Sequence, residues 1–296
     1  EVSLIDAQDT RLVQEKFNDT AHIVESTLLP ELFERQVAQS PDAIALVFGE
    51  QCLSYKELDA QANQLAHHLA NLGIGTEDIV GLALERSVEM VVALYAVLKA
   101  GAAYLPLDPD YPIERLSFML EDSGARSLIT TSAIHERLKD GYKQVRRNSV
   151  SADSPESDTE VDQLLRSALL LDDTDLQRSL SGASAVALTN RSRVRPLSAQ
   201  NLAYLIYTSG STGKPKGAGN THVAVVNRIE WMQDLLKLDG RDRVLQKTPF
   251  SFDVSVWEFL LPLFNGAQLV VAAPGEHKSP KYIATLIERR GITTLH

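Results

Sequence analysis

The chain has 296 residues, 44% of them apolar, which is enough for one large domain or two ordinary ones with a substantial core. Its formal net charge of −10 argues against nucleic-acid binding, because a phosphate backbone needs a basic protein surface. A single cysteine, Cys52, excludes an intramolecular disulfide and a cysteine-rich metal site, and it fits a cytoplasmic location. The longest apolar run, Met90–Leu98, is shorter than the roughly 20 residues that a membrane span needs.

The first part of the chain predicts alternating helices and strands. Ser54 and Glu57 have the spacing of a capping box and begin a helical pattern that continues to Leu72. An apolar strand at Ile79–Leu84 follows, and then a nearly all-apolar helix at Ser87–Ala100, which we expect to be deeply buried. The alternation continues with a strand at Tyr104–Leu107, a helix at Glu114–Ser123 and a strand at Ser127–Thr130.

The same alternation resumes after Asn201. The expected elements are strands at Leu202–Tyr207, Val244–Lys247 and Gln268–Ala272, and helices at Thr221–Leu236, Val254–Phe264 and Pro280–Arg289. Strands and helices in this order are typical of βαβ units. The sequence therefore predicts an α/β fold with mostly parallel sheets flanked by helices.

Residues 143–195, between these two blocks, have a different composition. The stretch Ser151–Asp162 is rich in serine and acidic residues and has few apolar side chains, so it buries too little surface to offset its ordering entropy. We therefore expect residues 143–195 to form a polar surface insert that is mobile over 147–162. A short helix is expected at Leu164–Leu171.

A glycine-rich loop is the most informative stretch of the chain. The segment Leu202–Gly217 reads LAYLIYTSGSTGKPKG, an apolar strand followed directly by glycines, hydroxyl side chains and two lysines. Backbone N–H groups, hydroxyls and ammonium groups together can bind a polyphosphate. The candidate phosphate-binding residues are Thr208, Ser209, Gly210, Ser211, Thr212, Gly213, Lys214 and Lys216.

The composition of this loop is also compatible with two other kinds of segment. The P-loop motif has four residues between its glycines and a Ser or Thr after its lysine. Here only two residues separate Gly210 from Gly213, and Pro215 follows Lys214, so a P-loop NTPase is excluded. A flexible Ser/Gly linker is the second alternative. The strand before the loop and the lysines after it count against a linker.

Three further stretches accompany the loop. They are LSYKEL at Leu53–Leu58, LKAGAAYLPLDPDYPIERL at Leu98–Leu116 and FSFDVSVWEF at Phe250–Phe259. Together with the loop, and in the same order, they resemble the core motifs of the adenylate-forming superfamily, most closely those of nonribosomal peptide synthetase adenylation domains. The resemblance begins near Leu28, and residues 1–27 resemble the linker that follows an upstream condensation domain.

The resemblance implies a fold and a reaction. Residues 28–296 would form an incomplete adenylation large domain, with two mostly parallel sheets flanked by helices and truncated before its final barrel and C-terminal lid domain. The reaction would join an amino acid to ATP, giving an aminoacyl-adenylate and pyrophosphate, and the aminoacyl group would then pass to a carrier-protein thiol. ATP with Mg2+ would be the cosubstrate, and the carrier and condensation domains would be partners in a multimodular parent.

The resemblance also assigns substrate-binding residues. Asp253 matches the acid that pairs with the substrate α-ammonium, although an Asp before a helix can also be its N-cap. Val254 and Trp257 match positions that line the side-chain pocket, where the alternative for Trp257 is core packing, and Phe252 matches an aromatic near the substrate carboxylate. The trio Asp253, Val254 and Trp257 is similar to pockets that select serine or a similar small residue.

The sequence also departs from the pattern of the family. The family's adenine- and ribose-binding segments and its catalytic lysine have no counterpart before His296, so no catalytic or metal-binding residue is assigned. We expect this chain alone neither to adenylate nor to bind ATP tightly. Gly219 stands where the family has β-branched residues, and a glycine weakens a strand. The alternatives are an aryl- or acyl-CoA ligase of the same superfamily, which Asp253 disfavours, and a non-catalytic remnant or scaffold.

Overall fold

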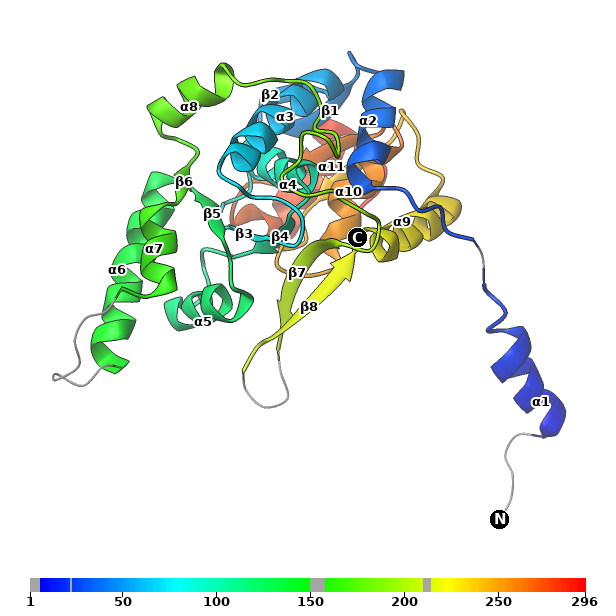
Figure 1. Cartoon of the computed structure of the whole chain (residues 1–296). Helices are drawn as coiled ribbons and strands as arrows, with labels where there is room; N and C mark the ends of the chain where they lie inside the picture. The colour runs from blue at the N-terminus through cyan, green and yellow to red at the C-terminus, as the bar shows by residue number, and fades with distance from the viewer. Residues whose placement is uncertain (1–5, 22, 150–157, 210–213) are drawn as a thin grey trace.

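Two β-sheets with helices packed around them make up the body of the protein (Figure 1). The computed structural model describes residues 6–21, 23–149, 158–209 and 214–296. One sheet has four strands in the order β2-β1-β10-β9, and the other has six in the order β6-β5-β3-β4-β7-β8. The pairs β1–β2 and β7–β8 are antiparallel, and the remaining strand pairs within the two sheets are parallel. The predicted α/β fold with two mostly parallel sheets is confirmed.

The four-stranded sheet joins the beginning of the body to its end. The strands are β1 (Ile44–Phe48), β2 (Gln51–Ser54), β9 (Arg243–Gln246) and β10 (Gln268–Val271). β1 and β2 form a hairpin that carries the exposed Cys52, and β10 lies between β1 and β9. Thr294 forms a parallel bridge with Val244 of β9, so the last described residues lie at the free edge of this sheet.

The six-stranded sheet carries the glycine-rich loop. Its strands are β3 (Ile79–Leu82), β4 (Ala103–Pro106), β5 (Ser127–Thr130), β6 (Leu169–Leu170), β7 (Leu202–Thr208) and β8 (Lys216–Thr221). β3, β4 and β5 are buried along their whole length, as expected for parallel strands covered on both faces. β7 and β8 form a hairpin that extends from the body (Figure 1).

Two helices form the centre of the core. The α3 helix (Tyr55–Asn71) begins at the predicted capping box, where the Ser54 N–H donates to Glu57 Oε2 at 2.8 Å. The α4 helix (Val88–Ala100) begins at Ser87 and is buried at every position except Glu89. It contacts β3 and β4 of one sheet and β1 of the other, so it packs the two sheets together.

The remaining helices surround the sheets. They are α1 (Ala7–Arg11), a π-helical turn (Leu12–Lys16), α2 (Leu29–Gln39), α5 (Ile113–Ser123), α6 (Ser132–Ser149), α7 (Glu160–Arg166), α8 (Thr174–Ser181), α9 (His222–Leu236), α10 (Ser255–Phe264), a 3-10 turn (Glu276–Lys278) and α11 (Pro280–Arg290). The α1 helix stands away from the two sheets (Figure 1). None of the helices in the described ranges has the length and apolarity that crossing a bilayer requires.

The polar segment 143–195 differs in part from the prediction. The segment begins inside α6. The helix expected at Leu164–Leu171 is α7, which ends at Arg166, and Leu169 and Leu170 form the short strand β6 beside β5. Leu164 and Leu165 are buried in the core of the six-stranded sheet, so the segment is not only a surface insert. Of the stretch 147–162 that was expected to be mobile, residues 150–157 lie outside the described residues, whereas 147–149 belong to α6 and 160–162 to α7.

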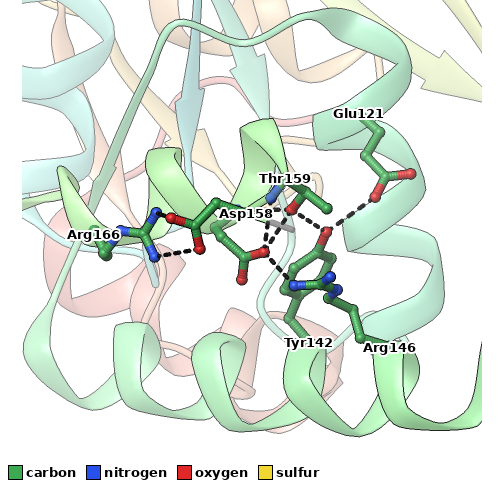
Figure 2. Close-up of polar contacts among 7 residues, drawn as sticks. Glu121, Tyr142, Arg146, Asp158, Thr159 and Arg166 are labelled. Carbon is green, nitrogen blue, oxygen red and sulfur yellow. Dashed lines mark hydrogen bonds and ion pairs between the residues drawn. The ribbon is translucent and has the colours of Figure 1, made fainter. Parts of the chain in front are cut away.

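A polar cluster joins α6, α7 and α5 beside that segment (Figure 2). The Tyr142 hydroxyl lies 2.8 Å from Thr159 Oγ1 and donates to Glu121 Oε1 at 3.2 Å. Arg146 donates to Asp162 at 2.6 Å. These contacts hold the helices on either side of residues 150–157 together.

Candidate functional site

The β7–β8 hairpin places the flanks of the glycine-rich loop close together. Thr208, at the end of β7, lies opposite Lys216, at the start of β8. Lys214 and Lys216 are both exposed, so their ammonium groups are available to an anion. Of the predicted phosphate-binding residues, the structure thus places Thr208 opposite Lys216, and Ser209 and Lys214 are exposed close to them in the sequence. The other four, Gly210, Ser211, Thr212 and Gly213, lie outside the described residues.

The base of the loop is anchored to α5. The Tyr207 hydroxyl donates to Asp122 Oδ2 at 2.7 Å, and burial raises the pKa of this phenol, so it remains a neutral donor. The Phe118 ring meets the Tyr207 ring edge-on, with centroids 6.2 Å apart, and Lys214 Nζ lies 5.9 Å from the Phe118 centroid. These contacts fix the direction in which the hairpin presents its lysines.

The glycines of β8 have a packing role that explains why this strand forms. A Cβ atom at Gly219 would lie 2.9 Å from Leu202 Cδ2, and one at Gly217 would lie 3.1 Å from Leu205 Cδ1. Both glycines therefore let the side chains of β7 lie directly against the backbone of β8. The expectation that Gly219 weakens the strand stays a prediction.

The loop between β9 and α10 presents Asp253. The N-cap of α10 is Val254, with no side-chain capping bond, so the N-cap role considered for Asp253 is wrong. Ser255 Oγ instead donates to the Phe252 carbonyl at 2.6 Å and ties the loop to the helix. Within the described part of the chain, no hydrogen bond or ion pair engages the exposed Asp253 carboxylate, which leaves it available to a cationic ligand.

A cavity of about 370 Å³ brings together three of the four predicted substrate residues. Its lining includes Tyr204, Asn220, Arg228, Met232, Asp253, Val254, Trp257 and His296. The Trp257 side chain is largely buried but still reaches the cavity, so it has both the packing role and the lining role that the sequence allowed. Phe252 is 56% exposed and does not line the cavity.

His296 is a cavity residue that the sequence analysis missed. Its ring meets the Trp257 ring at 69°, with centroids 6.4 Å apart. The alternation of helices and strands along the chain was the signal that could have found it. A strand is expected after α11, and the structure places these residues beside β9. The bridge between Thr294 and Val244 is the start of that pairing.

The cavity and the loop share one strand. Tyr204 lines the cavity and Thr208 flanks the loop, and four residues of β-strand cover about 13 Å. Burial, and then the nearby Asp253 charge, raise the pKa of Tyr204 to about 12, so this wall of the cavity is uncharged at neutral pH. A ligand with a cationic end at Asp253 could therefore extend along β7 toward the lysines.

The described residues show no metal-binding cluster of three or more His, Cys, Asp or Glu side chains.

Comparison with known proteins identifies related sequences and folds. The profile of the family described as AMP-binding enzyme matches residues 33–296. The chain is 41% identical to zwittermicin A synthase ZmaJ of Bacillus cereus over 271 residues, which are 92% of this chain and 46% of that protein. The chain thus spans less than half the length of this relative.

Solved structures show the same fold. The nonribosomal peptide synthetase FmoA3 (S1046A), in its alpha-methyl-L-serine-AMP bound form, superposes with a TM-score of 0.79 at 30% identity, covering 99% of this chain and 29% of that one. The N-terminal subdomain of Klebsiella oxytoca NpsA superposes with a TM-score of 0.70 at 27% identity, covering 93% of this chain and 61% of that one.

Proposed function

The chain belongs to the AMP-binding enzyme family, and we propose that it contributes the ATP-phosphate and amino-acid sites of an adenylation reaction. Within this family it resembles the N-terminal part of nonribosomal peptide synthetase adenylation domains. In this reaction the amino-acid carboxylate attacks the α-phosphate of ATP. An aminoacyl-adenylate forms and pyrophosphate leaves. The aminoacyl group then passes to a carrier-protein thiol.

One observation carries the proposal: Asp253, Val254 and Trp257 line a single cavity next to the strand that leads into the lysine-flanked loop. An α-ammonium group taken into a partly dry cavity needs a compensating anion, and the Asp253 carboxylate supplies one. A simple aryl or acyl acid has no such cation. This acid therefore favours an amino-acid substrate over the substrates of an acyl-CoA ligase.

The protein's part in this reaction is to position the reactants and to stabilise charge. Thr208, Ser209, Lys214 and Lys216 would bind the β- and γ-phosphates and then the leaving pyrophosphate, because hydroxyl and ammonium donors stabilise the growing negative charge. Asp253 would hold the amino acid with its carboxylate directed toward the α-phosphate. ATP would arrive with Mg2+, for which no described residue is assigned.

The proposed amino acid is serine or a residue of similar size. The Asp253, Val254 and Trp257 trio is similar to pockets that select serine, and the His296 imidazole in the same cavity offers a polar contact to a hydroxyl group. The wider partners, a carrier domain and an upstream condensation domain preceded by the 1–27 linker, are part of the same proposal.

Amino-acid-dependent ATP–pyrophosphate exchange tests the proposal. The assay should cover the standard amino acids and use both this chain and the complete product of its gene. Exchange that depends on serine or a similar small amino acid supports the proposal. Exchange with aryl or acyl acids but no amino acid favours the ligase, and absence of both exchange and ATP binding from the complete gene product favours the remnant.

A further inference from the structure

Glu258 is a buried carboxylate on the first turn of α10 with no role in the proposed reaction. Its side chain is 0% exposed, and burying an acid is costly unless hydrogen bonds replace its water. Three donors do so. Thr248 Oγ1 donates to Glu258 Oε1 at 2.7 Å, while the Thr248 N–H and Gln246 Nε2 donate to Oε2 at 3.1 and 3.0 Å.

These donors lie at the start of the loop that carries Asp253. Gln246 is the last residue of β9, and its amide nitrogen also donates to the Thr248 carbonyl at 2.6 Å. Arg86, which follows β3 in the other sheet, donates to the Gln246 side-chain oxygen and to the Lys247 carbonyl, the latter at 2.6 Å. The chain where β9 ends is therefore held from α10 on one side and from the six-stranded sheet on the other.

The far end of the same loop is held by the same helix. Ser255 Oγ donates to the Phe252 and Phe250 carbonyls, at 2.6 and 3.2 Å. Ser255 and Glu258 are three residues apart on α10, so their side chains lie on neighbouring positions of one helix face. Ser255 and Glu258, on one turn of α10, therefore hold the two ends of the loop that connects β9 to α10.

Asp253 depends on this loop for its position. Its carboxylate forms no capping bond on α10 and no ion pair within the described part of the chain. We infer that Glu258 is a positioning residue, which fixes the loop from Lys247 to Asp253 in the conformation that presents the Asp253 carboxylate to the cavity. Its effect on amino-acid binding rests on the proposed function, whereas its effect on the loop does not.

The chemistry of the site explains why a carboxylate suits this position. The Thr248 N–H and Gln246 Nε2 only donate, so Glu258 Oε2 accepts from both, whereas the Thr248 hydroxyl on Oε1 can donate or accept. Glu258→Gln keeps the shape of the side chain but removes the charge that strengthens all three hydrogen bonds. Burial raises the pKa of Glu258, and the hydrogen bonds from Thr248 and Gln246 and the charge of Arg86 oppose that rise. The donors around Glu258 therefore oppose the effect of burial and stabilise the carboxylate.

Amide hydrogen exchange by mass spectrometry tests the effect on the loop, using Glu258→Gln and the milder Thr248→Val. We expect peptides covering residues 247–256 to exchange roughly tenfold faster in both variants, while α4 peptides change little. Thr130→Val is the matched control, because it removes a comparable hydroxyl bond, from Thr130 Oγ1 to the Ala83 carbonyl at 2.8 Å, in the other sheet. It should leave the loop unchanged.

Kinetics on the complete gene product test the consequence for the substrate. Glu258→Gln should raise KM for the amino acid about tenfold and leave KM for ATP nearly unchanged. Unchanged amide hydrogen exchange in the loop, or an equal increase throughout the body, overturns the inference. If Glu258→Gln does not fold, the result for Thr248→Val decides. If the wild type shows no amino-acid-dependent exchange, the proposed function fails, and hydrogen exchange still decides the role of Glu258.

Discussion

The Trp257 indole and the His296 imidazole meet edge to face, with ring centroids 6.4 Å apart, and together form one wall of the cavity that contains Asp253. Trp257 belongs to α10, whereas His296 arrives beside β9 through the bridge between Thr294 and Val244. The part of the wall that His296 forms therefore depends on the pairing of the end of the described chain with β9.

Replacing His296 with alanine should widen the set of accepted amino acids. The change removes the imidazole from the wall and enlarges the cavity, and an extra methylene in an apolar pocket usually changes discrimination about 10- to 200-fold. We expect the ratio of kcat/KM for serine to kcat/KM for a larger amino acid, such as leucine, to decrease by about 10- to 200-fold in the variant. Pyrophosphate exchange across the amino acids measures this ratio, and an unchanged ratio would contradict the role of His296 in the wall.

Asp253→Asn should abolish most amino-acid activation. The amide keeps the size of the side chain but removes the charge that balances an α-ammonium group, and a lost charged hydrogen bond costs about 1.5–3 kcal/mol. We expect kcat/KM for the amino acid to fall about 10- to 100-fold, with KM for ATP little changed. Asp234→Asn, an exposed site on α9 outside this cavity, is the matched control and should behave like the wild type.

Lys214→Met should weaken ATP binding. The variant keeps most of the length of the side chain but removes a charge from the flank of the loop, together with the contact between that ammonium and the Phe118 ring. A lost charged contact to phosphate corresponds to roughly a tenfold rise in KM for ATP. Lys281→Met on the exposed face of α11 serves as the control. If both variants raise KM equally, the effect comes from net charge and the local role of Lys214 is refuted.

Much of the fold was predictable from local signals. The capping box at Ser54, the N-cap at Ser87 and the glycine at Gly101, which ends α4 with a φ of +92°, each act within a few residues of the element they define. The order of the strands and helices then implied mostly parallel sheets. In the site, local sequence was sufficient to bring Asp253, Val254 and Trp257 together, because one helical turn and its preceding loop carry all three.

Features that depend on distant partners were harder to predict. β6 has only two residues and exists because Leu169 and Leu170 pair with β5, so the leucine-rich stretch there looked like a helix. His296 reaches the cavity only through sheet pairing. The α6 helix was missed although Ile134, Leu138 and Tyr142 recur at helical spacing and are buried, because the polar residues around them dominated the composition.

Lys99→Met should destabilise the fold. The Lys99 side chain is 1% exposed, and its ammonium lies 2.5 Å from Glu34 Oε1 and 2.8 Å from Asp59 Oδ1. Removing the cation leaves two carboxylates without their partner, which typically costs about 3–5 kcal/mol of unfolding free energy. Urea unfolding measures the change. Lys56→Met removes a surface ion pair with Asp42 and should have little effect, so comparable losses in both variants would refute the prediction.

The free energy of unfolding should decrease as the pH is lowered, partly because of His222. This side chain is fully buried at the start of α9, where its Nδ1 accepts a hydrogen bond from the Leu29 N–H at 3.3 Å. Burial, with a smaller contribution from the Arg193 charge, lowers its pKa from 6.5 to about 4. The folded state therefore keeps the ring neutral where the unfolded state already binds a proton.

The sign and the pH range of the effect follow from these two pKa values. Above pH 6.5 the ring is neutral in both states and stability is unaffected, whereas between pH 6.5 and about 4 protonation favours the unfolded state, to a limit of about 3 kcal/mol. Below pH 4 the folded state also binds the proton and the difference stays constant. His222→Asn removes this term, so its unfolding free energy should fall less steeply between pH 7 and pH 4 than that of the wild type. Urea unfolding at steps of one pH unit measures both slopes, and parallel slopes would show that His222 does not cause the loss.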